Sequence, residues 1–309
     1  MGSLIGHVVP GVFFSIYAFW ITLSIFWEYY HVKLSRRPNQ SNNNNSSKAN
    51  GANQYRPPVV PRQTWRSCSC LPPAITVFKV VAIVVGMLGE YFTALDANWR
   101  FAETHNGQHM TMFAFFFFNA LFELMYHYGV PGLPPCLDKI TGALAFGIEG
   151  LLFLWHLHGR NMLDIQVHTF LVYAISMCTV GCLLEIQFPG DVRTMLFTTG
   201  ATMAQGTWFL CVGFILYPPE GWGHWDPESH EHRMWVTMMF TWNIAMILTL
   251  QIFTGVLIYT LVKRKMVTQG CLVVIGDQAA AGGYMTLPQE EVNMNLLETG
   301  GDHDEDQFA

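Results

Sequence analysis

Charged residues are scarce in this 309-residue sequence: they account for 12% of the chain, while apolar residues account for 51%. An ordinary soluble domain carries roughly a quarter charged residues. So apolar a chain needs lipid around it, which argues against a soluble globular protein. We therefore expect the lipid bilayer to be a partner of this chain, and we expect no nucleic-acid partner.

Motifs that fix a reaction are also missing. The sequence contains no H-E-x-x-H or C-x-x-C metal motif, no G-x-S-x-G nucleophile motif and no P-loop. The sequence therefore favours a non-enzymatic protein, although ionisable side chains inside apolar stretches leave other chemistry open.

Seven stretches of the chain approach or exceed the roughly 20 apolar residues that a helix needs to cross the hydrocarbon core. A closed barrel is the other way to span a membrane, but these runs are too long and too continuously apolar for its alternating strands. The sequence therefore predicts an all-α fold, a seven-helix transmembrane bundle. The predicted spans cover approximately residues 8–30, 74–95, 108–127, 137–157, 164–187, 194–217 and 233–262.

Basic residues are concentrated between the first two spans, where the loop 31–73 holds seven Lys and Arg residues and no acid. Cytoplasmic loops carry the excess of Lys and Arg, so we expect this loop to be cytosolic. Seven spans then place the N-terminus on the lumenal or extracellular side and the C-terminus in the cytosol. Lys263, Arg264 and Lys265 follow the last span, and the acidic loop 218–232 falls on the opposite side, as this topology requires.

Two segments are so polar that they cannot bury enough apolar surface to offset the conformational entropy lost on ordering. The Asn-rich stretch 38–54 predicts a flexible loop, and the acidic segment 266–309 predicts a disordered cytosolic tail after a transmembrane domain at 1–265. In the tail, Tyr284 and Leu287 fit the Tyr-x-x-apolar sorting signal that clathrin-adaptor-type proteins read. Four-residue patterns of this kind often occur by chance, so a merely solvated tail is the alternative.

Acidic residues occur inside the predicted spans, where a charge at the bilayer centre costs about 2.5 to 3.5 kcal/mol. The four glutamates Glu90, Glu123, Glu149 and Glu185 lie on four different spans. We expect them to face the bundle interior. Each needs protonation, hydrogen bonds, an imidazolium partner or a bound cation to neutralise it.

Histidines occur near the ends of the spans that we place on the lumenal side. Glu149 and His156 are seven residues apart and share one face of a helix, and Asp164 and His168 are four apart. With His109 on the third span, three neighbouring helices can each turn an imidazole and an acid toward one interior.

Two interpretations of these residues stay open. In the first, they form a structural polar network that includes Glu123, Glu185, Asp164 and Gln205, with Asp164 as the N-cap of the fifth span and Gln205 as a hydrogen-bonding link between helices. In the second, they relay protons or bind a transition metal such as zinc through neutral imidazoles. The metal ligands would be His109, His156, His168, Glu149 and Glu90.

Several blocks of the sequence resemble the transmembrane protein 45 family. The clearest are the Gly-Ile-Glu-Gly block at 147–150, the His-Leu-His-Gly-Arg block at 156–160 and the Gln-Gly-Thr-Trp block at 205–208. The resemblance covers about residues 1–265, and the Asn-rich stretch 38–54 looks like an insertion relative to that family.

This resemblance implies a multi-pass protein of seven spans in Golgi, endosomal, lysosomal or plasma membranes, with no established reaction. It also implies a role in membrane trafficking or innate immunity. Our first hypothesis is therefore a non-enzymatic endomembrane protein that acts through partners. The alternative is a metal-binding membrane enzyme, or a proton- or metal-coupled transporter, that uses the lumenal histidines and glutamates.

Overall fold

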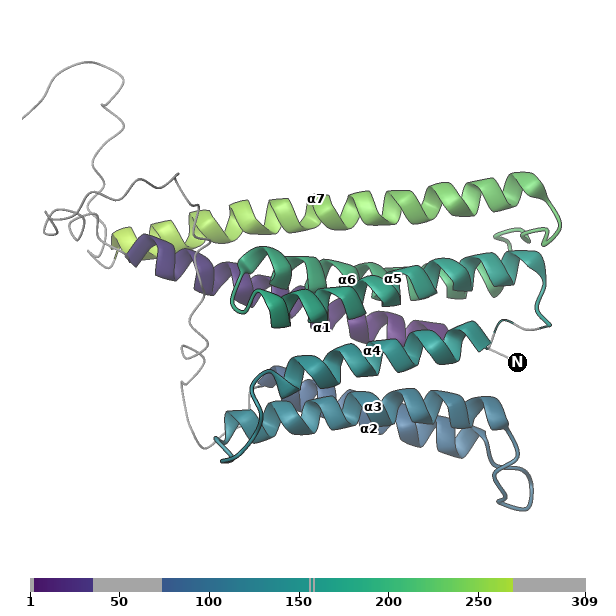
Figure 1. The fold of residues 1–309 in the computed structure, drawn as a ribbon. Helices are drawn as coiled ribbons and strands as arrows, with labels where there is room; N and C mark the ends of the chain where they lie inside the picture. The colour runs from purple at the N-terminus through teal and green to yellow at the C-terminus, as the bar shows by residue number, and fades with distance from the viewer. Residues whose placement is uncertain (1–2, 36–73, 156, 158, 269–309) are drawn as a thin grey trace, which may run out of the picture.

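A computed structural model of the protein describes residues 3–35, 74–155, 157 and 159–268 (Figure 1). Each predicted span corresponds to one helix there, so the all-α prediction is confirmed. The seven helices are α1 (Leu4–Ser35), α2 (Ala74–Thr93), α3 (Thr104–His127), α4 (Leu137–Trp155), α5 (Met162–Gln187), α6 (Val192–Leu216) and α7 (His230–Thr268).

The helices lie roughly side by side, and consecutive helices from α2 to α6 pack against each other in sequence order (Figure 1). Helix α1 has its most extensive contact with α6 and also touches α2 and α7, so it closes the ring of helices. Helix α7 lies outside this ring against α1, α6 and α5. Because successive helices run in opposite directions, the start of one lies beside the end of the next.

Helices α1 and α7 are longer than the predicted spans, with 32 and 39 residues. The apolar pattern marks only the length that lipid covers, whereas the backbone hydrogen bonds of a helix continue into polar residues beyond it. In α7 they continue through Lys263, Arg264 and Lys265.

Five of the seven helices in the described ranges are long and apolar enough to cross a membrane, namely α1, α2, α5, α6 and α7. The other two, α3 and α4, are more polar or shorter. Helix α7 shows what surrounds the bundle, because Trp242, Ile252 and Phe253 are each about two-thirds exposed. Such a continuous exposed apolar surface is unstable in water and is expected in lipid.

Small residues let α1 and α6 approach closely. A Cβ added at Gly206 would lie 2.6 Å from the backbone nitrogen of Ser15, and one at Gly213 would lie 3.0 Å from Cβ of His7. Small residues at helix interfaces are the usual means of close packing in membranes. The position of His7 therefore depends on the absence of a side chain at Gly213.

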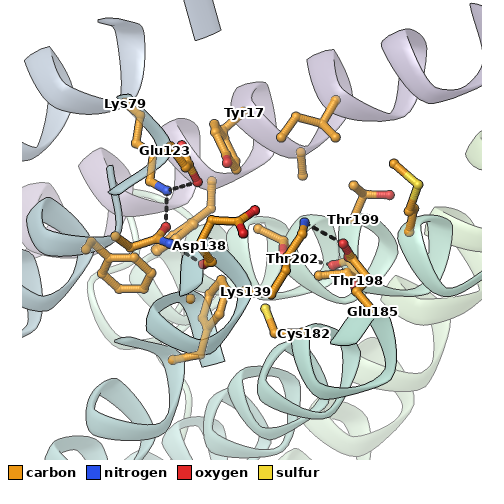
Figure 2. Close-up of a pocket in the computed structure, with 18 of the residues that line it drawn as sticks. Tyr17, Lys79, Glu123, Asp138, Lys139, Cys182, Glu185, Thr198, Thr199 and Thr202 are labelled. Carbon is orange, nitrogen blue, oxygen red and sulfur yellow. Dashed lines mark hydrogen bonds and ion pairs between the residues drawn. The ribbon is translucent and has the colours of Figure 1, made fainter. Parts of the chain in front are cut away.

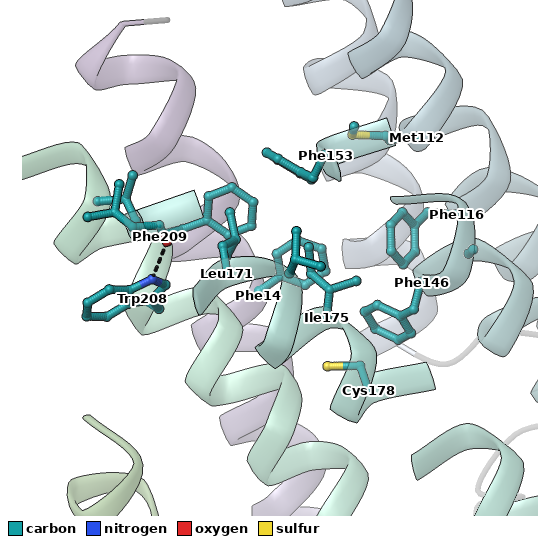
Figure 3. Close-up of a cluster of buried hydrophobic side chains, with 14 of the residues drawn as sticks. Phe14, Met112, Phe116, Phe146, Phe153, Leu171, Ile175, Cys178, Trp208 and Phe209 are labelled. Carbon is teal, nitrogen blue, oxygen red and sulfur yellow. Dashed lines mark hydrogen bonds between the residues drawn. The ribbon is translucent and has the colours of Figure 1, made fainter. Parts of the chain in front are cut away.

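The core of the bundle is aromatic (Figure 3). The ring of Phe14 on α1 lies 5.7 Å from that of Phe116 and 6.2 Å from that of Phe209. Trp208 is fully buried, and its indole nitrogen donates to the carbonyl of Val167 at 2.9 Å. This packing joins α1, α3, α5 and α6 and fixes the rotation of the helices that carry the polar side chains.

Candidate functional site

Two histidines far apart in the sequence meet near the end of the bundle where α1 begins. The Nε2 atoms of His7 on α1 and His168 on α5 are 3.5 Å apart, and the two rings meet edge to face. The side chains are buried, with 7% and 2% of each residue exposed. On the far side of its ring, Nδ1 of His7 lies 2.9 Å from the carbonyl oxygen of Ser3. We call His7 and His168 the histidine pair.

The second histidine of this pair is held by Asp164. Nδ1 of His168 lies 2.9 Å from the backbone oxygen of Asp164 and 2.8 Å from its Oδ1. The guanidinium of Arg160 donates to both carboxylate oxygens of Asp164, at 3.0 and 2.9 Å. The prediction that Asp164 is the N-cap of the fifth span is wrong, because Asn161 accepts from the amide of Asp164 and caps α5.

A second polar cluster lies at the middle of the bundle around Glu149. The side-chain amide of Gln205 donates to both carboxylate oxygens, at 2.9 and 3.0 Å. The Sγ of Cys178 is 3.3 Å from Oε1 of Gln205, and Oγ1 of Thr202 is 3.7 Å from that sulfur. Glu149 is 3% exposed and Gln205 is fully buried. This cluster links α4, α5 and α6.

Two lysines provide the partners of Glu123 and Glu185. Lys79 on α2 donates to Glu123 on α3 at 2.9 Å and also to the side chain of Asn119. Lys139 on α4 forms an ion pair with Glu185 on α5. Sequence reasoning missed both lysines. Helix direction could have found them, because each lysine lies near the start of its helix and each glutamate near the end of an adjacent antiparallel helix.

These ion pairs line a cavity of about 120 Å³, which we call the lysine chamber (Figure 2). Helices α1 to α6 all contribute side chains to its wall. The chamber is polar on several sides and has room for several water molecules. Its polar lining consists of Tyr17, Lys79, Asn119, Glu123, Asp138, Lys139, Glu185, Thr198, Thr199 and Thr202.

A third pairing joins α2 to α3. Nδ1 of His109 lies 3.0 Å from Oε1 of Glu90. The side-chain amide of Asn106 donates to the backbone oxygen of Glu90 and to the hydroxyl of Thr93. These contacts tie the end of α2 to the start of α3.

The structure thus places four of the five predicted metal ligands, and it divides these four among three places. Glu90 and His109 lie together, Glu149 is bound to Gln205, and His168 contacts His7. Across residues 3–35, 74–155, 157 and 159–268, no three His, Cys, Asp or Glu side chains gather as in a metal site. His156 lies outside the described residues, as do Tyr284 and Leu287, so these parts of the prediction stay predictions.

The acids and the glutamine of the predicted polar network each have a partner. Glu123 and Glu185 pair with lysines, Asp164 with Arg160 and His168, and Gln205 with Glu149. Their contacts cross between helices except at Asp164, whose partner His168 lies on the same helix. These side chains can hold the helices together through ion pairs and hydrogen bonds. Their carboxyl and imidazole groups can also bind protons, and the two imidazoles of the histidine pair turn ring nitrogens toward each other.

In a comparison with known protein families, residues 135–260 match a family of unknown function (DUF716). The matched segment runs from just before α4 into α7 and includes Glu149, His168 and Gln205. It does not include His7, His109 or the lysine of α2.

The chain is also similar to transmembrane epididymal proteins. It is 26% identical to human transmembrane epididymal protein 1 over 145 residues, which are 47% of this chain and 53% of that protein. The corresponding rat protein is 24% identical over 147 residues, which are 47% of this chain and 48% of that protein. Mouse transmembrane epididymal protein 1A is 21% identical over 246 residues, 79% of this chain and 77% of that protein.

The chain therefore spans about half the length of the human and rat relatives that it matches. Together with the apolar helices, these relatives show that the chain is a multi-pass membrane protein. Its residues 135–260 are similar to a family of unknown function. The transmembrane protein 45 family is not among these names, so that resemblance rests on the sequence blocks alone.

Proposed function

We propose that this chain is a seven-span protein of the endomembrane system that acts through partner proteins, in membrane trafficking or innate immunity, and not by catalysing a reaction. Its N-terminus lies on the lumenal or extracellular side and its C-terminus in the cytosol. The basic loop 31–73 and the basic residues after the last span support this orientation.

The packing of α3 and α4 supports seven spans. Helix α3 packs between α2 and α4, and α4 packs between α3 and α5. Together, α3 and α4 therefore lie between α2 and α5, which are apolar enough to cross the membrane. On α3, the side chains of Asn119 and Glu123 are paired with Lys79 of α2 and need no water at the lipid surface.

One observation carries the proposal that the polar residues are structural. Each of the four span glutamates has a partner on a different helix. The pairs are Glu90 with His109, Glu123 with Lys79, Glu149 with Gln205 and Glu185 with Lys139. Removing one partner of a buried ion pair costs about 3 to 5 kcal/mol. Side chains used in this way hold the bundle together, which leaves the loop 31–73 and the tail 266–309 to meet partners.

The tail carries the sorting part of the proposal. Tyr284 and Leu287 would bind a clathrin-adaptor-type protein and direct the chain among Golgi, endosomal, lysosomal and plasma membranes. The test compares the full-length variants Tyr284→Ala and Leu287→Ala with Met285→Ala, which changes a variable position of the same motif. Surface biotinylation measures the fraction at the plasma membrane. We expect the first two variants to accumulate at the surface and Met285→Ala to behave as the parent, while an unchanged distribution of all three contradicts the sorting role.

A metal-binding membrane enzyme or a proton- or metal-coupled transporter is the second candidate. The histidine pair favours it, because two buried imidazoles face each other at 3.5 Å. The chemistry of that contact supports a sharper inference.

A further inference from the structure

The tautomers of the histidine pair follow from its backbone contacts. A carbonyl oxygen only accepts hydrogen bonds, so Nδ1 of His7 beside Ser3 and Nδ1 of His168 beside Asp164 must both carry hydrogen. In a neutral imidazole the other nitrogen then has a lone pair and no hydrogen. The two Nε2 atoms therefore face each other as two acceptors, and that contact is repulsive unless a cation lies between them.

The distance between the two nitrogens favours a metal ion over a proton. A hydrogen bond with a nitrogen donor usually spans about 2.7 to 3.2 Å, so the 3.5 Å observed is long for a shared proton. Zinc binds imidazole nitrogen at about 2.0 to 2.1 Å. Two nitrogens 3.5 Å apart then subtend an angle of about 117° at the ion, close to tetrahedral coordination.

The surroundings of the pair also match those of a metal ligand. A ligating histidine usually gives its other ring hydrogen to a carboxylate or a carbonyl, which fixes the ring and strengthens the ligand nitrogen. His168 meets both acceptors on Asp164, and Arg160 holds that carboxylate in place. The ring of His168 also lies 6.2 Å from that of Phe153, nearly parallel to it.

We propose that His7 and His168 bind one transition-metal ion through their Nε2 atoms, an ion that accepts neutral imidazole, such as zinc(II) or copper(I). This site does not depend on the trafficking function proposed above, and it deepens the second candidate by naming the ligands and the class of metal. It keeps His168 from the predicted ligand set and replaces the other four ligands with His7. Within the described chain, no third His, Cys, Asp or Glu joins the pair.

The test measures metal binding by the full-length protein in detergent, purified through a tag without histidine and stripped with a chelator. Equilibrium dialysis against zinc(II), or against copper(I) under reducing conditions, gives the bound metal per chain. We expect one ion per chain, with affinity at least tenfold lower in His7→Ala and in His168→Ala. The matched control is His109→Ala, because His109 pairs with Glu90 and should leave the affinity unchanged.

Two further variants keep the test decisive if the alanine variants fold poorly. Asp164→Asn preserves both ligands and should weaken binding roughly 10- to 100-fold, as the loss of such a supporting carboxylate usually does. Gly213→Ala also preserves both ligands, and its new Cβ would lie 3.0 Å from Cβ of His7, so it should weaken binding by displacing that ring.

Three results would overturn the proposal. The first is a parent protein that binds neither metal at millimolar concentration. The second is binding that His109→Ala removes and His7→Ala does not, which would return the site to the ligands predicted from the sequence. The third concerns the protein without metal: its thermal stability falls as the pH rises from 5 to 8, and this fall is absent in His7→Ala and in His168→Ala. That result identifies a shared proton. None of these results bears on sorting by Tyr284.

Discussion

Lys79 and Glu123 form an ion pair of 2.9 Å between α2 and α3, with only 6% of the lysine side chain exposed. The same ammonium group donates to Asn119, so a single cation satisfies two acceptors on α3. The lysine is buried inside the bundle, where it lines the lysine chamber, and the pair is stable only while both partners are present.

Removing only one partner of this pair should destabilise the protein strongly. We expect Lys79→Met to lower the free energy of unfolding by about 3 kcal/mol, the lower end of the cost of breaking a buried pair, because the carboxylate that loses its cation is only partly buried. The double variant Lys79→Met with Glu123→Leu should recover most of that loss, since no charge is left behind. Thermal unfolding in detergent measures both effects. Additive losses in the double variant would show that the two side chains are not coupled.

The central carboxyl group should depend on its amide partner in a similar way. We expect Gln205→Leu to destabilise the protein by about 1 to 3 kcal/mol, because Glu149 then has an unsatisfied buried carboxyl group. Glu149→Gln keeps a hydrogen-bonding partner for Gln205 and should cost less. Unfolding of the two variants under one set of conditions makes the comparison. If Glu149→Gln proves the more damaging change, the carboxylate has a function that its contact with Gln205 does not explain.

Asp191 offers a test of pH dependence outside the spans. Its side chain caps α6 and accepts from the guanidinium of Arg193, and this hydrogen bond holds the pKa of Asp191 below its ordinary value. A carboxyl group whose pKa is lowered on folding stabilises the protein above its unfolded pKa of about 3.9, and that stabilisation is lost as the pH falls through the lower folded pKa.

The variant Asp191→Asn should therefore be less stable than the parent near neutral pH. The difference should shrink below pH 4 and vanish in stronger acid. Asparagine is also a good N-cap, so the variant removes the charge and keeps the cap. A series of thermal unfolding curves at falling pH measures this. A difference that stays constant with pH would mean that the charge of Asp191 contributes nothing.

The helices were predictable because length and apolar character are local properties of the chain. Their ends were harder to predict: Thr104 and Thr268 lie in polar sequence, where hydropathy gives no signal and hydrogen bonding decides. The inward direction of Glu149 and Glu185 was also predictable, since a charge in lipid is costly.

The partners were not predictable in the same way. His7 and His168 are 161 residues apart in sequence, and the topology placed them only at the same end of the bundle. Which faces meet depends on helix rotation, and that rotation depends on contacts such as Gly213 against His7. The pairing of Lys139 with Glu185 was easier to predict. Lys139 lies near the start of α4 and Glu185 near the end of the antiparallel α5, so both lie at the same level in the membrane.

The topology itself can be tested by glycosylation. The loop 31–73 contains three Asn-x-Ser patterns, at Asn39, Asn44 and Asn45, and a cytosolic loop meets no glycosylation enzyme. We expect no shift in gel mobility of the full-length protein after glycosidase treatment. An acceptor sequence fused ahead of Met1 should be glycosylated, because seven spans place that end in the lumen. The variant Asn39→Gln should migrate as the parent does. A parent protein that loses mass with glycosidase, together with an unmodified N-terminal fusion, would reverse the orientation and place the histidine pair at the cytosolic face.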